Sequence, residues 1–99
     1  MSFVNTHPEL LSAAAADLQV IGSALGTGNV AAAAPTTGVL PPAADEISAL
    51  IAAQFATQAQ MYQQIAAQAT AIHQQLVDTL AANAEGYATT EALNAAAAG

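Results

Sequence analysis

The chain has 99 residues, enough for one domain, and 29 of them are alanine, so a core built from them is marginal. Its seven carboxylates and its lack of lysine and arginine disfavour binding to nucleic acid or anionic lipid, and exclude the positively charged region of an ordinary secretory signal peptide. The absence of cysteine excludes disulfides and thiolate metal sites, and we expect a soluble, acidic, helical protein.

A first helix is predicted over about residues 7–34. Thr6 and Glu9 have the spacing of a capping box, and Pro8 is tolerated in the first turn because its missing N–H would be unpaired there. Apolar and small residues then recur at alternating steps of three and four, which is typical of helices that pack nearly parallel: Leu11, Ala14, Leu18, Ile21, Leu25, Gly28 and Ala32.

Three glycines lie in the second half of this helix. Gly22, Gly26 and Gly28 each lower helix stability by about 1 kcal/mol relative to alanine, so the helix is expected to be weak beyond Leu25. Glycines on a packed face can instead let another backbone come close. The sequence favours the first interpretation and leaves the second open.

Residues 35–42 form the predicted connector. Pro35 disfavours helical geometry at Ala34, and the pair Pro41-Pro42 fixes an extended entry to the next helix. A connector of this length between two helices normally produces an antiparallel hairpin.

The second predicted helix, about residues 43–85, contains neither glycine nor proline. Asp45 and Glu46 lie near its start, where acidic side chains suit the helix dipole. Its larger apolar residues recur at helical spacing, with a first set at Ile47, Ile51, Phe55, Tyr62, Ile65, Ile72, Leu76 and Leu80 and a second at Leu50, Met61 and Val77. At roughly 1.5 Å per residue the helix would be about 60 Å long, which nothing else in the chain is large enough to cover.

Residues 86–99 are predicted to form a flexible tail. Gly86 is the residue type that usually stands just past a helix end, and the tail behind it is rich in alanine. Tyr87 and Glu91 have Tyr-x-x-x-Glu spacing, which is common by itself but here follows the expected end of a two-helix hairpin. The alternative is a frayed last turn in which Tyr87 merely packs on the helix.

Together the two helices carry more apolar surface than they can bury against each other. We predict an all-α fold in which an antiparallel two-helix hairpin (residues 1–85) buries one stripe of each helix and completes a four-helix-type bundle with a partner chain. Burial stabilises by roughly 25 cal/mol per Å² of apolar surface, so leaving this stripe in water would lose several kcal/mol of stabilisation. A self-contained, loosely folded hairpin is the alternative. The predicted partner interface comprises Leu11, Leu18, Ile21, Leu25, Ile47, Leu50, Ile51, Phe55, Met61, Tyr62, Ile65, Ile72, Leu76 and Leu80.

The sequence contains no arrangement typical of an enzyme. His7 and His73 are its only histidines, and neither has the partners of a nucleophilic triad or a metal site. Asp45 and Glu46 are adjacent and therefore point in different directions on a helix. We predict a non-enzymatic protein that uses no cofactor and no small-molecule substrate.

Several short motifs together resemble the N-terminal domain of the mycobacterial PE family, over essentially all 99 residues. They are the opening Met1-Ser-Phe-Val4, the pair Pro8-Glu9, the run Pro41-Pro42-Ala-Ala-Asp45 and the closing Gly86-Tyr87-Ala-Thr-Thr-Glu91. Each motif is weak alone, whereas the combination is specific. The first helix departs from the family in lacking the basic residues that members often carry there, so a partner salt bridge through such residues is absent.

The resemblance implies a helical hairpin that pairs with a PPE-family protein into a heterodimer. It also implies export by a type VII secretion system to the outside or to the cell-envelope surface, without a cleavable signal peptide. Tyr87 and Glu91 match that system's Tyr-x-x-x-Asp/Glu export signal. A cytosolic EspG-type chaperone is expected to act indirectly, through the far tip of the PPE partner.

Two other classes of function stay open. The alanine-rich seam would suit a self-associating structural protein, and the helices would suit a binder of lipid surfaces. A pairing protein should be insoluble or weakly helical alone, a self-associating one should form a stable dimer, and a lipid binder should gain helicity only with lipid. Long uncharged windows are interrupted by glycine, asparagine and proline or by glutamine, so no membrane-spanning helix is predicted.

Overall fold

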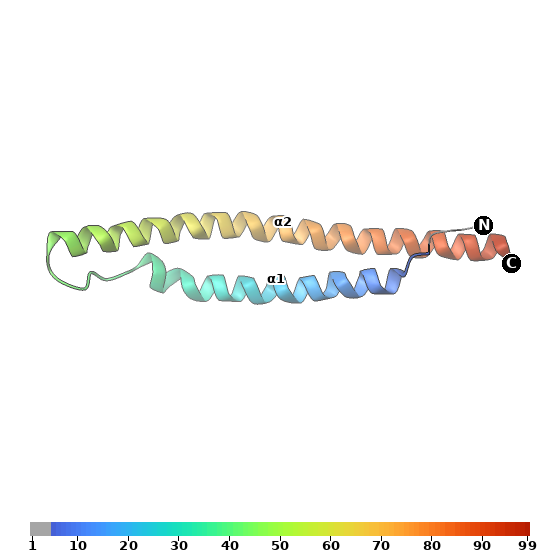
Figure 1. The fold of residues 1–99 in the computed structure, drawn as a ribbon, viewed down its shortest axis with the longest axis horizontal. Coiled ribbons are helices and arrows are strands. Elements are labelled where there is room, and N and C mark those ends of the chain that lie inside the picture. Colours follow the sequence, from blue (N-terminus) through green and yellow to red (C-terminus); the bar gives the residue numbers. More distant parts are fainter. Residues whose placement is uncertain (1–4) are drawn as a thin grey trace. The chain divides into compact units, whose positions relative to one another are not determined.

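The computed structural model describes residues 5–99, and within that range the chain contains two helices and no strand (Figure 1). Helix α1 spans Pro8–Thr37 and helix α2 spans Glu46–Ala98. The all-α prediction is therefore confirmed. The opening motif Met1-Ser-Phe-Val4 lies outside the described residues.

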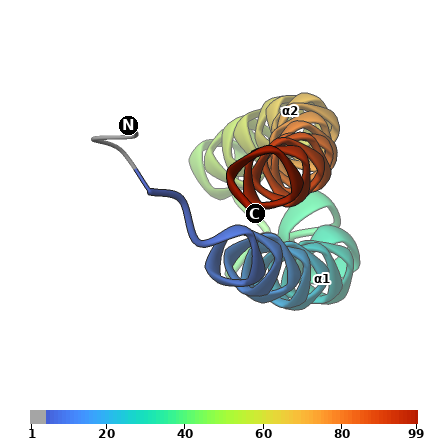
Figure 2. The same ribbon diagram turned by 90° about the vertical axis from the view of Figure 1, so that its right-hand side faces the viewer.

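The chain divides into two compact units. The connector unit, residues 23–72, contains the second half of α1, the connector and the first part of α2. The terminal unit, residues 1–22 and 73–99, contains the start of α1 and the end of α2. In each unit the two helix segments run antiparallel, as predicted. Figure 2 faces the terminal unit, and Figure 1 shows that the blue start of α1 lies beside the orange part of α2, with the red end of α2 continuing beyond it.

Helix α1 begins one residue later than the predicted capping box requires. The carbonyl oxygen of His7 accepts the backbone N–H groups of Leu10 at 2.9 Å and Leu11 at 3.3 Å, so His7 rather than Thr6 holds the N-cap position. Glu9 is consequently out of register with Thr6, and its carboxylate lies 3.5 Å from Nδ1 of His7 instead. The capping-box prediction was wrong for this reason.

Helix α1 also continues through Pro35 to Thr37, beyond its expected end at residue 34. The hydroxyl groups of Thr36 and Thr37 donate to the carbonyl oxygens of Ala32 and Ala33, at 2.5 and 2.6 Å. Pro35 leaves the carbonyl of Ala31 without its backbone donor, and the threonine bonds strengthen the two carbonyl positions that follow it.

Helix α2 begins at Glu46, a few residues later than expected, because Asp45 caps it. The Asp45 carboxylate accepts the Ser48 backbone N–H at 2.7 Å and the Ser48 hydroxyl at 2.9 Å. The backbone hydrogen bond from Ser48, followed by the hydroxyl bond, holds the pKa of the Asp45 carboxyl below its ordinary value.

At its other end α2 runs through Gly86 to Ala98, where we expected a helix end and a flexible tail. Gly86 does not have a positive φ, so it forms no left-handed C-cap. The residues behind it are mostly alanine, the strongest helix former, and their propensity offsets the cost of about 1 kcal/mol for one interior glycine.

Small residues form the buried face of the helices in both units. Ala15, Val77 and Ala84 are 5%, 7% and 1% exposed in the terminal unit, and Ala52 is 5% exposed in the connector unit. Half-buried residues recur around them at helical spacing, at Leu11, Leu18, Gly22, Gly26 and Asn29 on α1 and at Ala56, Ala59, Gln63, Ala66, His73 and Leu80 on α2.

The prediction that stripes of large residues fill the hairpin's own seam was wrong for most of them. On α1 the buried position is Ala15, whereas Ile21 and Leu25 are exposed; on α2, Ile47 and Phe55 are exposed while Ala52 is buried. The distance between packed helices depends on the side chains at their contact, and alanine and glycine permit the closest approach. The hairpin therefore buries its small residues and leaves its large ones outside.

Candidate functional site

The predicted partner residues are largely uncovered. Three of them, Leu11, Leu18 and Leu80, are half-buried in the terminal unit. The other eleven are between 47% and 70% exposed: Ile21, Leu25, Ile47, Leu50, Ile51, Phe55, Met61, Tyr62, Ile65, Ile72 and Leu76. Exposed large apolar residues in such number on one small chain mark a surface for another molecule. The connector unit carries nine of these eleven residues.

An apolar groove of about 480 Å³ lies in the connector unit, between α1, the connector and α2. Phe55 and Tyr62, two turns apart on α2, line it together with Val39 of the connector. The Tyr62 hydroxyl donates to Oδ1 of Asn29 at 2.7 Å, and Nε2 of Gln63 donates to the Asn29 carbonyl oxygen at 3.0 Å. These two bonds tie α2 to α1 beside the groove.

His73 connects the two helices in the terminal unit. Its Nε2 lies 2.6 Å from the carbonyl oxygen of Leu18, and because a carbonyl oxygen can only accept, Nε2 is the donor in this bond. A Cβ atom on Gly22 would lie 2.7 Å from Cδ2 and 2.8 Å from Nε2 of that ring. Gly22 therefore makes room for a side chain, and not for another backbone as the close-approach interpretation had it, and a Cβ at Gly26 or Gly28 would meet nothing within 4 Å.

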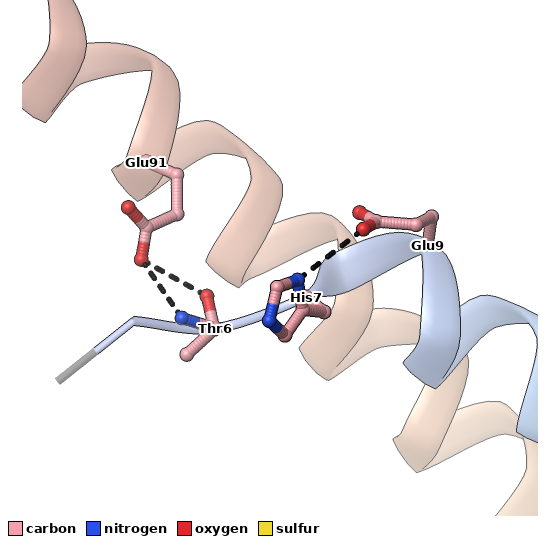
Figure 3. A network of polar contacts seen from close by, with 4 residues as sticks. All are labelled: Thr6, His7, Glu9 and Glu91. Carbon is pink, nitrogen blue, oxygen red and sulfur yellow. Dashed lines mark hydrogen bonds and ion pairs between the residues drawn. The ribbon is translucent and has the colours of Figure 1, made fainter.

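The residues of the predicted export signal lie one helical turn apart on α2. Tyr87 is 47% exposed, and Glu91 is half-buried. Oε1 of Glu91 accepts the Thr6 hydroxyl at 3.0 Å and the Thr6 backbone N–H at 3.4 Å (Figure 3). Glu9, the second residue of the Pro8-Glu9 pair, reaches only His7 in this network.

Sequence reasoning did not identify the roles of Thr6, Asn29, Gln63 and His73. Three of these polar side chains occupy half-buried positions of an otherwise apolar or alanine pattern, at Asn29, Gln63 and His73. That interruption was the available signal, because a polar group on a packed face needs a hydrogen-bond partner. Thr6 carried no such signal, since the capping-box spacing already explained it.

Among residues 5–99 there is no group of three or more His, Cys, Asp or Glu side chains that could hold a metal ion. By length and composition alone, α1 is long and apolar enough to cross a membrane. An 18-residue stretch of it has a mean hydropathy of 1.3 and is 6% buried. This differs from the prediction of no membrane-spanning helix, which rested on the glycine, asparagine and proline residues that interrupt this segment. The alanine, valine and leucine residues of α1 nevertheless raise its mean hydropathy more than those residues lower it. Core helices of soluble proteins and N-terminal signal sequences share this property.

Comparison with known proteins gives a consistent result. The model of the PE family matches residues 4–94. The chain is 62% identical to PE family protein PE13 of Mycobacterium tuberculosis H37Rv over 98 residues, which cover 99% of both proteins. It is 52% identical to PE family protein PE8 of the same strain and 56% identical to PE-PGRS family protein PE_PGRS33 of strain CDC 1551, and it spans only 36% and 20% of those longer proteins. With its two helices and these matches, the chain belongs to the PE family.

Proposed function

We propose that this chain is a non-enzymatic protein that forms an obligate heterodimer with a PPE-family protein and leaves the cell by type VII secretion. The observation that carries the proposal is the inverted distribution of side-chain size. Small residues such as Ala15, Ala52 and Ala84 occupy the buried face, while Ile, Leu, Phe and Met side chains lie outside.

The energetic argument follows from that distribution. Fully burying one Leu, Ile, Phe or Met side chain contributes roughly 1.5–3 kcal/mol. Eleven large apolar residues of the predicted interface are exposed, and covering even half of that surface would contribute an amount comparable to the roughly 5–15 kcal/mol that typically separates folded from unfolded states. A partner that covers these residues therefore supplies much of the stability of the fold. Two further helices would do so in a four-helix-type bundle.

The groove in the connector unit supports a helical partner in particular. Its apolar lining and its volume suit large side chains presented by a neighbouring helix, and the bonds that Asn29 makes to Tyr62 and Gln63 fix its wall. The chain has a formal net charge of −7 without a single lysine or arginine, so electrostatic repulsion disfavours a second copy as that partner.

The export part of the proposal is supported by family membership and by the side chains of Tyr87 and Glu91, which the helical continuation of α2 separates by one turn. We propose that Tyr87 and Glu91 form the Tyr-x-x-x-Glu signal that the type VII machinery recognises. An EspG-type chaperone would bind the PPE partner in the cytosol and meet this chain only indirectly.

Co-purification tests the partner assignment. A tagged copy of the chain is expressed in its native host, and the protein that remains bound through purification is identified by mass spectrometry. Since the chain contains no lysine or arginine, it must be cleaved with a protease other than trypsin. A stoichiometric PPE-family protein supports the proposal, whereas recovery of the tagged chain without a second protein contradicts it.

The apolar character of α1 favours binding to a lipid surface as a second candidate function. In that case isolated chain would gain helicity when neutral lipid vesicles are added, and co-expression with a PPE protein would leave its solubility unchanged. Circular dichroism with and without vesicles separates the two functions.

A further inference from the structure

The segment just before α1 bonds directly to the last residue of the proposed export signal. Thr6 donates both its hydroxyl, at 3.0 Å, and its backbone N–H, at 3.4 Å, to Oε1 of Glu91 (Figure 3). Both side chains are half-buried, and the two residues are 85 positions apart in the chain. The contact therefore joins the start of the hairpin to the end of α2.

The chemistry of the chain makes this contact important for Glu91. Without lysine or arginine, the side chains that can donate to a carboxylate here carry a hydroxyl, an amide or an imidazole. His7 lies against Glu9 instead, and among residues 5–99 the hydroxyl of Thr6 is the side-chain donor that meets Glu91. Hydrogen bonds to an ionised acceptor are roughly twice as strong as bonds between neutral groups.

The two bonds restrict Glu91 without covering it. Both end on Oε1, and among residues 5–99 no donor is bonded to Oε2, so Oε2 is the oxygen that we assign to a donor from another protein. Tyr87 is one turn away on the same helix and about half of its surface is open. The bonds from Thr6 therefore hold the carboxylate in place relative to the turn of α2 that carries the phenol.

We propose that Thr6 is a positioning residue of the export signal, and that the signal is complete only when the start of α1 has folded against the end of α2. The inference rests on the proposed function of Tyr87 and Glu91. The secretion machinery would then recognise the phenol and the carboxylate together, with its own hydrogen-bond donor on Glu91. A chain whose hairpin is open would present the same two residues without their fixed geometry.

The test compares Thr6→Val, which keeps the shape of threonine but removes the hydroxyl, with Thr6→Ser, which keeps the hydroxyl. Each variant is expressed in the native host with its endogenous partner, and export of the chain is measured together with the amount of intracellular complex. Loss of a hydrogen bond to a charged group corresponds to about a tenfold change in an equilibrium constant, so Thr6→Val should lower export about tenfold. Thr6→Ser should restore most of it, with the complex unchanged in both.

A second measurement reports how firmly the end of α2 is held. Amide hydrogen exchange across residues 86–98 of the purified complex should be faster in Thr6→Val than in the wild-type chain, and Thr6→Ser should return it toward wild type. Tyr87→Ala and Glu91→Ala serve as controls for the signal. If these controls abolish export while Thr6→Val is exported normally, the role of Thr6 is refuted and the signal stands. If the Tyr87 and Glu91 controls are themselves exported normally, the assignment of these two residues as the export signal is refuted.

Discussion

The imidazole of His73 occupies the space that Gly22 leaves open on α1, where a Cβ atom would lie only 2.7 Å from the ring. The same ring donates to the carbonyl oxygen of Leu18, one turn earlier on α1. The absence of one side chain therefore permits a hydrogen bond between the helices. Gly26 lies one turn farther along α1 and has open space at its Cβ position, which makes it a matched comparison.

The first prediction concerns these two glycines. Gly22→Ala should displace His73 from Leu18 and lower the stability of the copurified complex by about 1–3 kcal/mol, the usual cost of overpacking. Gly26→Ala should instead stabilise it by up to about 1 kcal/mol, because alanine is the better helix former. Thermal melting followed by circular dichroism measures both. Equal effects of the two substitutions would contradict the role assigned to the His73 ring.

A second prediction tests the exposed apolar surface. Ile65→Asp places a carboxylate in the middle of the surface proposed to contact the partner, and an unpaired charge in a dry interface is strongly destabilising. Pairing should be lost in a pull-down assay. Gln60→Asp is the control, because it introduces the same charge on another face of α2. Unchanged co-purification of the Ile65 variant would place the interface elsewhere.

The export signal gives a third prediction. Tyr87→Ala and Glu91→Ala should each prevent export while leaving the intracellular complex intact, since neither residue belongs to the proposed partner interface. Immunoblots of culture filtrate and cell lysate measure the two quantities. Export of both variants at the wild-type level would remove Tyr87 and Glu91 from the signal.

The cap of α2 predicts a dependence on pH. Because the pKa of Asp45 is lowered in the folded state, its stabilising contribution is fully present above the ordinary aspartate pKa and is lost as the pH falls through the lower folded value. Protection of the Ser48 amide against hydrogen exchange should decline over that acidic window. In an Asp45→Asn variant the asparagine side chain can still cap the helix but does not titrate, so the decline should disappear. A decline that persists in this variant would assign it to another group.

The helical periodicity was sufficient to predict the two helices, because no other structure explains apolar spacing of three and four residues. Their antiparallel arrangement was predicted from the short connector. The periodicity could not decide which stripe faces inward. Periodicity marks Ile47, Ile51 and Phe55 as one face of the helix. Ala52, Ala56 and Ala59 lie on another face with equally regular spacing, and that face is the one buried because small residues allow closer packing.

The helix ends were predicted less well, and for local reasons. Pro35 and Gly86 are residue types that usually end helices, yet threonine hydroxyl groups support the turn at Pro35 and an alanine-rich segment carries α2 past Gly86. The contact between Thr6 and Glu91 joins residues far apart in sequence, so no local pattern indicates it.

The most direct test of the central claim is the thermal melting of the isolated chain, measured together with its mass by light scattering. The chain exposes its large apolar residues and buries mainly alanine, so alone it should aggregate or melt without cooperativity, and co-expression with its partner should yield a soluble complex with a sharp transition. A monodisperse monomer that unfolds cooperatively with nothing bound would contradict the claim that the partner completes the fold.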